Sequence, residues 1–403
     1  MGEHIRIGVR PSDGRTGTLG ELIHATIRQT IEVAAHAELA AALGAARYAR
    51  CDGRCGYRNG SRARTLTGPT GPLALTLPRA TLFTPAGTRE WTSTLLPRYQ
   101  RRLREVNEAV VATYLAGGNT RRLRGALGPL LKAAPLSKSA VSRIVGTLKA
   151  DLEAWRTRSL AGLDVLGLYL DALFLRVRSA GKVVGVPVLG VIAVLTDGQK
   201  QLLALDLCPG GETFEAWKAC LTDLGGRGLA APVWCVIDGH PGLRKAVGLV
   251  WPKALVQRCC VHKLRNLERK APKHALAEIR TDFHRIVYAD GAAAARGAYT
   301  AFERKWTPRC PGVVRSLQEG GEELLTFFQF PQHQWKTVRT TNVIERLNEE
   351  FRRRVKTQGA LPTEDAALVL LFGLVVSGQI RLRRLDGWRH IPAVLRARRE
   401  SAA

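Results

Sequence analysis

The sequence predicts an α/β core built on a mixed sheet, preceded by a mainly helical region and interrupted by a helical insertion. Three observations carry this prediction. Short apolar runs separated by turn residues fill residues 163–262, with one helical stretch among them. Helical patterns dominate residues 98–157 and 263–330. The chain has 61 Lys and Arg residues against 34 Asp and Glu residues, a net charge of +27, which predicts a polyanionic partner, and nucleic acid fits best.

Length and composition limit the possible number of domains and the class of protein. The 403 residues allow two or three domains, and an apolar content of 45% is enough to form a hydrophobic core in each. No apolar run reaches the ~18 residues of a membrane-spanning helix, and residues 1–10 lack the apolar centre of a signal peptide. Eight cysteines in such a chain are expected as reduced thiols, so we expect a cytoplasmic protein.

The N-terminal part predicts one long helix over residues 19–50. Its apolar side chains recur at helical spacing and suit packing or self-association; they are Leu22, Ile23, Ile27, Ile31 and Ala35. Cys51 and Cys55 follow at a spacing that could form half of a zinc site. Because no second pair of Cys or His follows closely, two plain thiols are the favoured interpretation.

Residues 56–80 predict a small β-hairpin unit. Asn59-Gly60 is a turn signal, and Leu73, Leu75 and Leu77 alternate as in a strand with one buried face. Four arginines are expected to be exposed, where they either contact phosphates or form a solvated basic face; these are Arg58, Arg62, Arg64 and Arg79.

Three helices are predicted over residues 98–157. The first runs over 105–116, the second over 121–133 after a cap at Asn119 or Thr120, and the third from Ser137 or Ser139 to Trp155, after a break at Pro135. Two helices joined by a short turn and rich in Lys and Arg predict a helix-turn-helix for DNA, although helical pairs are common. The candidate DNA-binding residues here are Arg121, Arg122, Ser139 and Arg143.

The core is predicted from its order of elements. Strands over 167–177, 182–195 and 201–207 are followed by a helix over 212–224 and a strand over 232–237. Three adjacent strands, a helix and a further strand that ends in an acidic residue form the order of a ribonuclease-H-like sheet. Asp238 follows the last strand directly, at the edge where open α/β sheets bind ligands.

Asp171 is the one carboxylate within the apolar run of residues 167–177. An ionised carboxylate buried there needs a compensating cation or hydrogen-bond donors. Taken alone, it is most simply interpreted as a partner of an arginine or of backbone amides. The sharper hypothesis is a metal ligand, which requires further carboxylates elsewhere in the chain.

The remaining candidates lie in the C-terminal half. Cys259 and His262 are spaced so that they could bind a metal, but a structural role at a strand end is favoured. A helix capped by Thr340, Thr341 or Asn342 places Glu345 in its first turn, with Glu349 one turn further on. An apolar helix over 364–384 is expected to pack on the sheet. Arg265 and Arg346 either contact phosphates or belong to solvated helix faces.

Several of these motifs, in this order, resemble the Mutator-type transposases of bacterial insertion sequences, which have an Asp-Asp-Glu active site. The resemblance runs over residues 57–371. Its carriers are Tyr57-Arg58-Asn59-Gly60, Pro78-Arg79, residues 137–143, Tyr169-Leu170-Asp171-Ala172, residues 237–243, residues 259–266 and residues 339–346. The segments around Asp238, Cys259 and Glu345 are together highly specific.

The resemblance implies that Asp171, Asp238 and Glu345 are the catalytic residues and hold two Mg²⁺ ions, with Mn²⁺ as a possible substitute. It implies a transposase that binds terminal inverted repeats, cuts double-stranded DNA at the transposon ends and joins them to target DNA as a homodimer or higher homo-oligomer, associated with the nucleoid. It leaves the role of Cys259 and His262 open. A catalytically inactive DNA-binding repressor and a structure-specific nuclease are the alternatives.

The predicted division of the chain follows from these elements. It consists of an N-terminal region over 1–95, a DNA-binding region with the helix-turn-helix over 96–160, the first part of the ribonuclease-H-like core over 161–262, the helical insertion over 263–334, and the second part of the core with a basic tail over 335–403.

Overall fold

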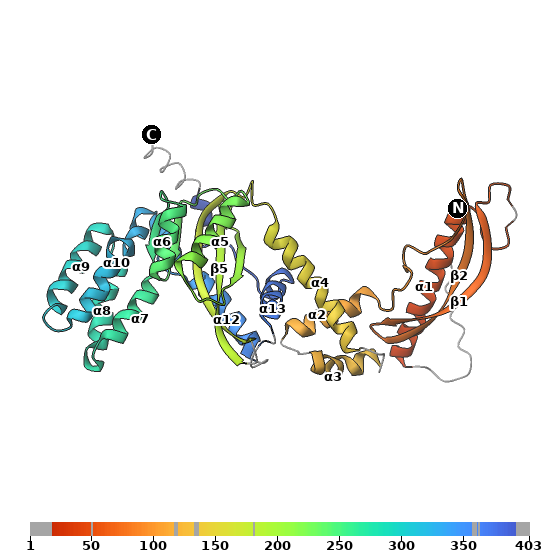
Figure 1. The fold of residues 1–403 in the computed structure, drawn as a ribbon, viewed down its shortest axis with the longest axis horizontal. Coiled ribbons are helices and arrows are strands. Elements are labelled where there is room, and N and C mark those ends of the chain that lie inside the picture. The colour runs from red at the N-terminus through yellow and green to blue at the C-terminus, as the bar shows by residue number, and fades with distance from the viewer. Residues whose placement is uncertain are drawn as a thin grey trace. The chain divides into compact units, whose positions relative to one another are not determined.

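The computed structural model describes residues 18–49, 51–116, 120–132, 137–179, 182–356, 361 and 363–391 (Figure 1). The chain divides into two compact units, unit 1 over Met1–Val145 and unit 2 over Gly146–Ala403. Among the described residues, no helix has the length and apolar character needed to cross a membrane.

Unit 1 begins with the long helix α1 (Leu19–Leu43). Thr18 and Glu21 form a capping box at its start, and Gly44 ends it in the left-handed conformation, at φ 63°. The helix is therefore shorter than expected, and the predicted last residue, Arg50, lies outside the described residues. Ala35 is buried against the neighbouring sheet, and Ile27 and Ile31 pack against the same core, so this part of the predicted stripe has a packing role. Leu22 and Ile23, which belong to the same stripe, are exposed.

A three-stranded antiparallel sheet follows, with the order β1 (Gly56–Gly68), β2 (Gly71–Thr84) and β3 (Gly87–Glu90). The turn between β1 and β2 lies after Gly68, so the interpretation of Asn59-Gly60 as a turn was wrong. Those two residues lie inside β1, where the pairing register shifts between Arg58 and Ser61. Gly60 adopts φ 72° at this bulge.

Three helices complete the first part of the chain. They are α2 (Arg104–Leu115), α3 (Thr120–Leu131) and α4 (Lys138–Thr157), of which α4 continues into unit 2. Each lies within one or two residues of its predicted range. The expected cap Asn119 and the expected helix break Pro135 lie outside the described residues.

Unit 2 is organised around a five-stranded mixed sheet with the order β6-β5-β4-β7-β8. β4 pairs antiparallel with β5 and parallel with β7; β5 pairs antiparallel with β6, and β7 parallel with β8. The strands are β4 (Val165–Ser179), β5 (Lys182–Leu195), β6 (Lys200–Leu207), β7 (Trp234–Ile237) and β8 (Leu255–Arg258). A mixed α/β core is therefore present, as the sequence predicted.

One face of this sheet carries the main core. Leu168 and Leu170 of β4 and Ile237 of β7 are buried there against Trp217 of α5 and Leu243 of α6. The two covering helices are α5 (Phe214–Gly226) and α6 (Pro241–Val250), the second of which the sequence did not predict. Because strand side chains alternate, Tyr169 and Asp171 are directed to the other face.

The remaining helices come after β8. Figure 1 shows α7, α8, α9 and α10 beside one another, and each contacts at least one of the others. They are α7 (Cys260–Lys270), α8 (Leu276–Val287), α9 (Ala292–Trp306) and α10 (Pro311–Gly320). After α11 (Gln332–Val338), the helices α12 (Asn342–Lys356) and α13 (Glu364–Val376) contact β4. The helix predicted over 364–384 thus ends early, before Gly378 at φ 73°.

Candidate functional site

Asp171 and Asp238 occupy neighbouring positions on two adjacent parallel strands, at the point where β7 ends. Leu170 of β4 pairs with Ile237 of β7, and each of these two residues is followed in sequence by an aspartate. Because Leu170 and Ile237 both enter the core on one face, the alternation of side chains directs both aspartates to the opposite face. The register of two neighbouring strands therefore brings together carboxylates that are 67 residues apart (238 − 171).

Helix α12 lies over that same face. A Cβ placed on Gly190 of β5 would be 3.2 Å from Cδ1 of Ile344, so the helix approaches the sheet where the strand carries no side chain. Gly190 is the register partner of Asp171. Asn348, one turn after Glu345, donates a hydrogen bond from Nδ2 to Oδ2 of Asp171 at 2.8 Å.

The electrostatics of Asp171 show that three carboxylates share this region. The residue is 8% exposed, and burial is the main reason that its pKa rises to about 7. The negative charges of Asp238 and Glu345 raise this pKa further, whereas the charge of His262 lowers it. Asp171 is thus a strand carboxylate whose ionisation is opposed by two neighbouring acids.

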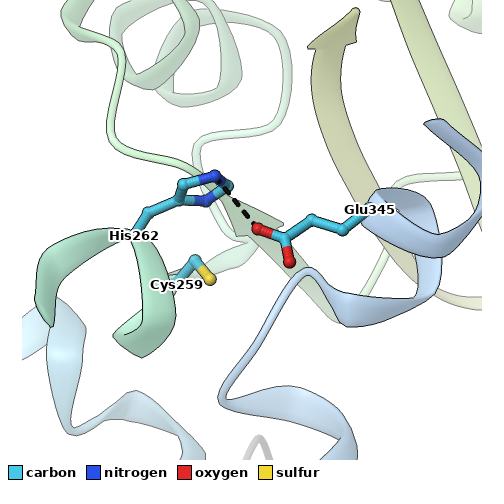
Figure 2. A group of neighbouring side chains, drawn as sticks. All are labelled: Cys259, His262 and Glu345. Carbon is cyan, nitrogen blue, oxygen red and sulfur yellow. Dashed lines mark ion pairs between the residues drawn. The ribbon is translucent and has the colours of Figure 1, made fainter. Parts of the chain in front are cut away.

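Glu345 lies in the first turn of α12 and faces α7 (Figure 2). Its Oε1 is 3.1 Å from Nε2 of His262 and also accepts a hydrogen bond from Nη1 of Arg265 at 3.1 Å. The Glu345 side chain is 18% exposed, so both partners hold a carboxylate that is largely shielded from water. His262 and Arg265, three residues apart on α7, orient this carboxylate.

Cys259 and His262 form a second polar group next to Glu345. The Cys259 thiol is buried at the N-cap of α7 and accepts hydrogen bonds from the Thr341 hydroxyl at 3.2 Å and the Thr341 amide at 3.3 Å. Burial opposes ionisation of this thiol, but hydrogen bonds and the charge of His262 lower its pKa from the ordinary value.

The imidazole of His262 responds to the same neighbours. Burial alone would lower its pKa, but Cys259, Asp171 and Glu345 together raise it to about 9. One ligand atom each from Cys259, His262 and Glu345 (a sulfur, an imidazole nitrogen and a carboxylate oxygen) lies within 4.8 Å of the other two, in the arrangement shown in Figure 2.

A fourth carboxylate, Glu212, lies close to Asp238. Burial raises the pKa of Glu212, a hydrogen bond from Trp217 Nε1 at 2.9 Å opposes that rise, and the charge of Asp238 adds to it. Asp238 in turn accepts a hydrogen bond from the His240 amide at 2.8 Å. Glu212 was not a predicted site residue, because it precedes α5 in a turn that carries no distinguishing pattern.

Two further residues escaped the sequence reasoning. Asn348 was interpreted only as part of a helix, although its spacing of three from Glu345 puts both on neighbouring positions of one face. Thr341 was considered only as a helix cap, whereas its hydroxyl also lies 3.4 Å from Nδ1 of His262.

The predicted DNA-binding residues are spread over both units. Arg121 and Arg122 lie in α3, and their side chains are outside the described part of the chain. Ser139 and Arg143 are exposed on the first turns of α4. In unit 2, Arg265 binds Glu345, whereas Arg346 lines a groove of about 1210 Å³ that also includes Glu345.

Unit 1 contains a basic groove of about 1010 Å³. Its lining includes the arginines Arg62, Arg64, Arg98, Arg101, Arg102 and Arg143. Arg64 is half-buried and donates to the carbonyls of Leu96, Pro97 and Gln100, so it holds the loop before α2 rather than facing solvent as expected. Burial lowers the pKa of Arg102, and the nearby positive charges of Arg143 and Arg101 lower it further.

Comparisons with known proteins identify the family of this chain. The model of the family "Transposase, Mutator family" matches residues 12–380, and the chain therefore belongs to the Mutator family of transposases. Its members as a class are enzymes that act on DNA.

Three curated relatives illustrate the match. The chain is 35% identical to the transposase for insertion sequence element ISRM5 of Rhizobium meliloti (strain 1021) over 362 residues, 89% of this chain and 87% of the relative. It is 33% identical to the transposase for IS1081 of Mycobacterium tuberculosis over 359 residues, 89% and 85% of the two chains. It is 31% identical to the transposase for IS905 of Lactococcus lactis over 361 residues, 88% and 89%.

Proposed function

We propose that this chain binds the terminal inverted repeats of an insertion element and catalyses Mg²⁺-dependent cleavage and strand transfer of DNA, with Asp171, Asp238 and Glu345 as the catalytic residues. The observation that carries the proposal is the meeting of three carboxylates from distant parts of the chain. Asp171 is buried, and the charges of Asp238 and Glu345 help to raise its pKa to about 7. A bound cation would offset both the burial of Asp171 and the repulsion among these carboxylates.

The donor set fits divalent magnesium. Carboxylate oxygens are the ligands that Mg²⁺ prefers, and a bound cation offsets the desolvation and mutual repulsion that burden Asp171. Asp171, Asp238 and Glu345 are the residues that would hold it. Magnesium bound there supplies Lewis acidity to the phosphate group and to the attacking and leaving oxygens.

The protein's own residues fix the orientation of these ligands. Asn348 donates to Oδ2 of Asp171, and the backbone of Ala172 also donates to this carboxylate. The His240 amide does the same for Asp238, and His262 and Arg265 fix Oε1 of Glu345. Hydrogen-bonded partners of this kind hold a ligand in one rotamer before substrate arrives, which lowers the reorganisation that the reaction requires.

The fold supports a ribonuclease-H-like core. Three antiparallel neighbours, β6, β5 and β4, continue into two parallel strands, with the first acidic residue on central β4 and the second after adjacent β7. We further propose that α3 and α4 form the helix-turn-helix, that the basic groove of unit 1 contacts DNA phosphates through Arg143, and that Arg346 contacts phosphates beside Glu345. Joining two ends then requires at least two copies of the chain.

The test is a strand-cleavage assay on a labelled duplex that carries one end of the element, with Mg²⁺, Mn²⁺ or Ca²⁺. Wild-type protein should nick at the end with Mg²⁺ or Mn²⁺ and transfer the nicked strand to a target plasmid. The substitutions Asp171→Asn, Asp238→Asn and Glu345→Gln should each abolish both reactions, by at least ~10³-fold, without loss of specific binding. Glu349→Gln is the matched control on α12, because Glu349 is exposed and its loss should leave activity intact.

The alternatives give other results. Specific binding of the end with no cleavage under any divalent cation would identify a DNA-binding repressor. Cleavage of branched DNA without regard to the terminal sequence would identify a structure-specific nuclease. Loss of activity in Glu349→Gln but not in Glu345→Gln would refute the assignment of the third carboxylate.

A further inference from the structure

The group formed by Cys259, His262 and Glu345 has donors of a different kind from those of the Asp171 and Asp238 pair. One ligand atom from each residue lies within 4.8 Å of the others. A tetrahedral zinc site with Zn–S of about 2.3 Å and Zn–N and Zn–O of about 2.0 Å needs ligand atoms roughly 3.3–3.6 Å apart. Nε2 of His262 and Oε1 of Glu345 are already close to this spacing, at 3.1 Å.

We infer that Cys259, His262 and Glu345 form a site for a zinc-like cation, and that occupation of this site takes Glu345 away from the magnesium site. The proposal adds an inhibitory metal site to the proposed function. Its binding part is independent of that function, whereas its inhibitory part rests on it.

The backbone around Cys259 prepares its sulfur for metal binding. Cys259 lies at the N-cap of α7, where the helix dipole favours negative charge. The hydroxyl and amide of Thr341 both donate to the sulfur. These contacts come from the segment just before α12, so the same turn that supports the thiol also places Glu345 opposite it. Such support around a ligand is typical of metal sites.

The donor chemistry selects the cation. Sulfur and imidazole prefer Zn²⁺, Co²⁺ or Cd²⁺, whereas Mg²⁺ prefers carboxylate oxygens and water. Three protein ligands leave the fourth tetrahedral position open to water. Magnesium binds such donors weakly, and the Asp171 and Asp238 pair offers zinc oxygen donors alone.

Sharing of Glu345 makes the two cations compete for one carboxylate. Oε1 of Glu345 is directed at His262 (Figure 2), and a carboxylate whose negative charge is taken up by zinc there binds magnesium beside the two aspartates less well. Zinc should then inhibit DNA cleavage competitively with respect to magnesium, and the inhibition should disappear in Cys259→Ser.

Binding is tested first, on the full chain without DNA. Because Cys51 and Cys55 are exposed free thiols that could bind metal as a pair, every sample carries the substitutions Cys51→Ser and Cys55→Ser. Titration with Co²⁺ should give one equivalent bound, with thiolate-to-cobalt charge-transfer absorption and tetrahedral ligand-field bands. X-ray absorption of the zinc-loaded chain should show one sulfur among nitrogen and oxygen ligands.

The ligands are then changed one at a time in this background. Cys259→Ser should abolish the charge-transfer absorption, and His262→Ala should weaken cobalt binding at least tenfold. Cys260→Ser is the matched control: Cys260 is adjacent and buried, but its sulfur lies near the Leu324 carbonyl, and its loss should leave the spectrum unchanged. Circular dichroism confirms that each variant is folded.

Two results overturn the site, and a third overturns its inhibitory role. Absence of thiolate-to-cobalt absorption in the background that carries only Cys51→Ser and Cys55→Ser disproves the site without recourse to any further variant. Persistence of that absorption in folded Cys259→Ser assigns it to another cysteine. If cobalt binds as expected but zinc does not compete with magnesium in the cleavage assay, the site exists and the inhibitory role is wrong.

Discussion

Asn348 donates a hydrogen bond from its side-chain amide to Asp171, across 177 positions of sequence, at 2.8 Å. Both residues are buried, with Asn348 at 5% and Asp171 at 8% exposure. The bond ties α12 to β4 at the level of the candidate catalytic carboxylates. It therefore couples the position of the helix that carries Glu345 to the orientation of Asp171.

The first prediction concerns this bond. Asn348→Ala leaves Oδ2 of Asp171 without its side-chain donor, so the carboxylate loses its fixed orientation. We expect DNA cleavage to fall by ~10–100-fold, as is usual when a residue that orients a metal ligand is removed. Asn348→Asp should be at least as harmful, because it adds a negative charge to an acidic site. A cleavage rate of Asn348→Ala within twofold of wild type would contradict the coupling.

The second prediction concerns the pH dependence of stability in metal-free protein. The pKa of Asp171 is about 7 in the folded chain and close to 3.8 when unfolded, so the folded state binds this proton more tightly. The contribution is fully present below pH ~4 and is lost as pH rises through ~7. Asp171→Asn should therefore be more stable than wild type at pH 8 by roughly 1–4 kcal/mol, and less so at pH 5.

Denaturation in urea with EDTA at pH 5, 6, 7 and 8 measures this difference. Excess Mg²⁺ should reduce the advantage of Asp171→Asn at pH 8, because a bound cation stabilises the ionised wild-type carboxylate. A stability difference that does not change between pH 5 and pH 8 would show that Asp171 is not the group that titrates.

The third prediction concerns Gly167 on β4. A Cβ at this position would lie 2.1 Å from Cε2 of the fully buried Trp234, whose ring also packs edge-on against Tyr169. Gly167→Ala should therefore destabilise the protein by roughly 1–3 kcal/mol through overpacking. Gly185→Ala at the exposed start of β5 is the control, since nothing lies within 4 Å of a Cβ built there. Thermal melting followed by circular dichroism measures both; equal melting temperatures would refute the packing argument.

The fourth prediction concerns DNA affinity. Arg143→Ala removes one cation from the basic groove of unit 1, so binding should weaken for specific and non-specific duplexes alike. The slope of log K against log salt should fall by about 1. Arg104→Ala is the matched control, because Arg104 is exposed on α2 and paired with Glu108. Fluorescence anisotropy at several salt concentrations checks this; an unchanged slope for Arg143→Ala would exclude the contact.

The strands of the core could be predicted because each combines an apolar run with a turn signal. The range of β5, Lys182–Leu195, coincides with its prediction, and β7 begins two residues later than expected. The turn at Asn59-Gly60 failed for a physical reason: the same left-handed backbone that suits a hairpin turn also suits a bulge, and only pairing with β2 distinguishes the two.

The site was less accessible to sequence reasoning than the fold. Asp171, Asp238 and Glu345 could be selected through motifs, but their surroundings depend on tertiary contacts that leave no local pattern. Arg265 was considered as a phosphate contact or a solvated side chain, and the structure places its guanidinium on Glu345. Glu212 and Asn348 reach the site only because α5 and α12 lie where they do on the sheet.

Ile344 of α12 approaches Gly190 of β5 so closely that a side-chain methyl group at position 190 would lie 3.2 Å from its Cδ1. The spacing between α12 and the sheet therefore depends on the absence of a side chain at this position. Gly190, which has no reactive group of its own, thereby influences the distance between Glu345 on α12 and the two aspartates. Variation at position 190 among natural chains should alter the rate of the chemical step, while the affinity for DNA stays the same.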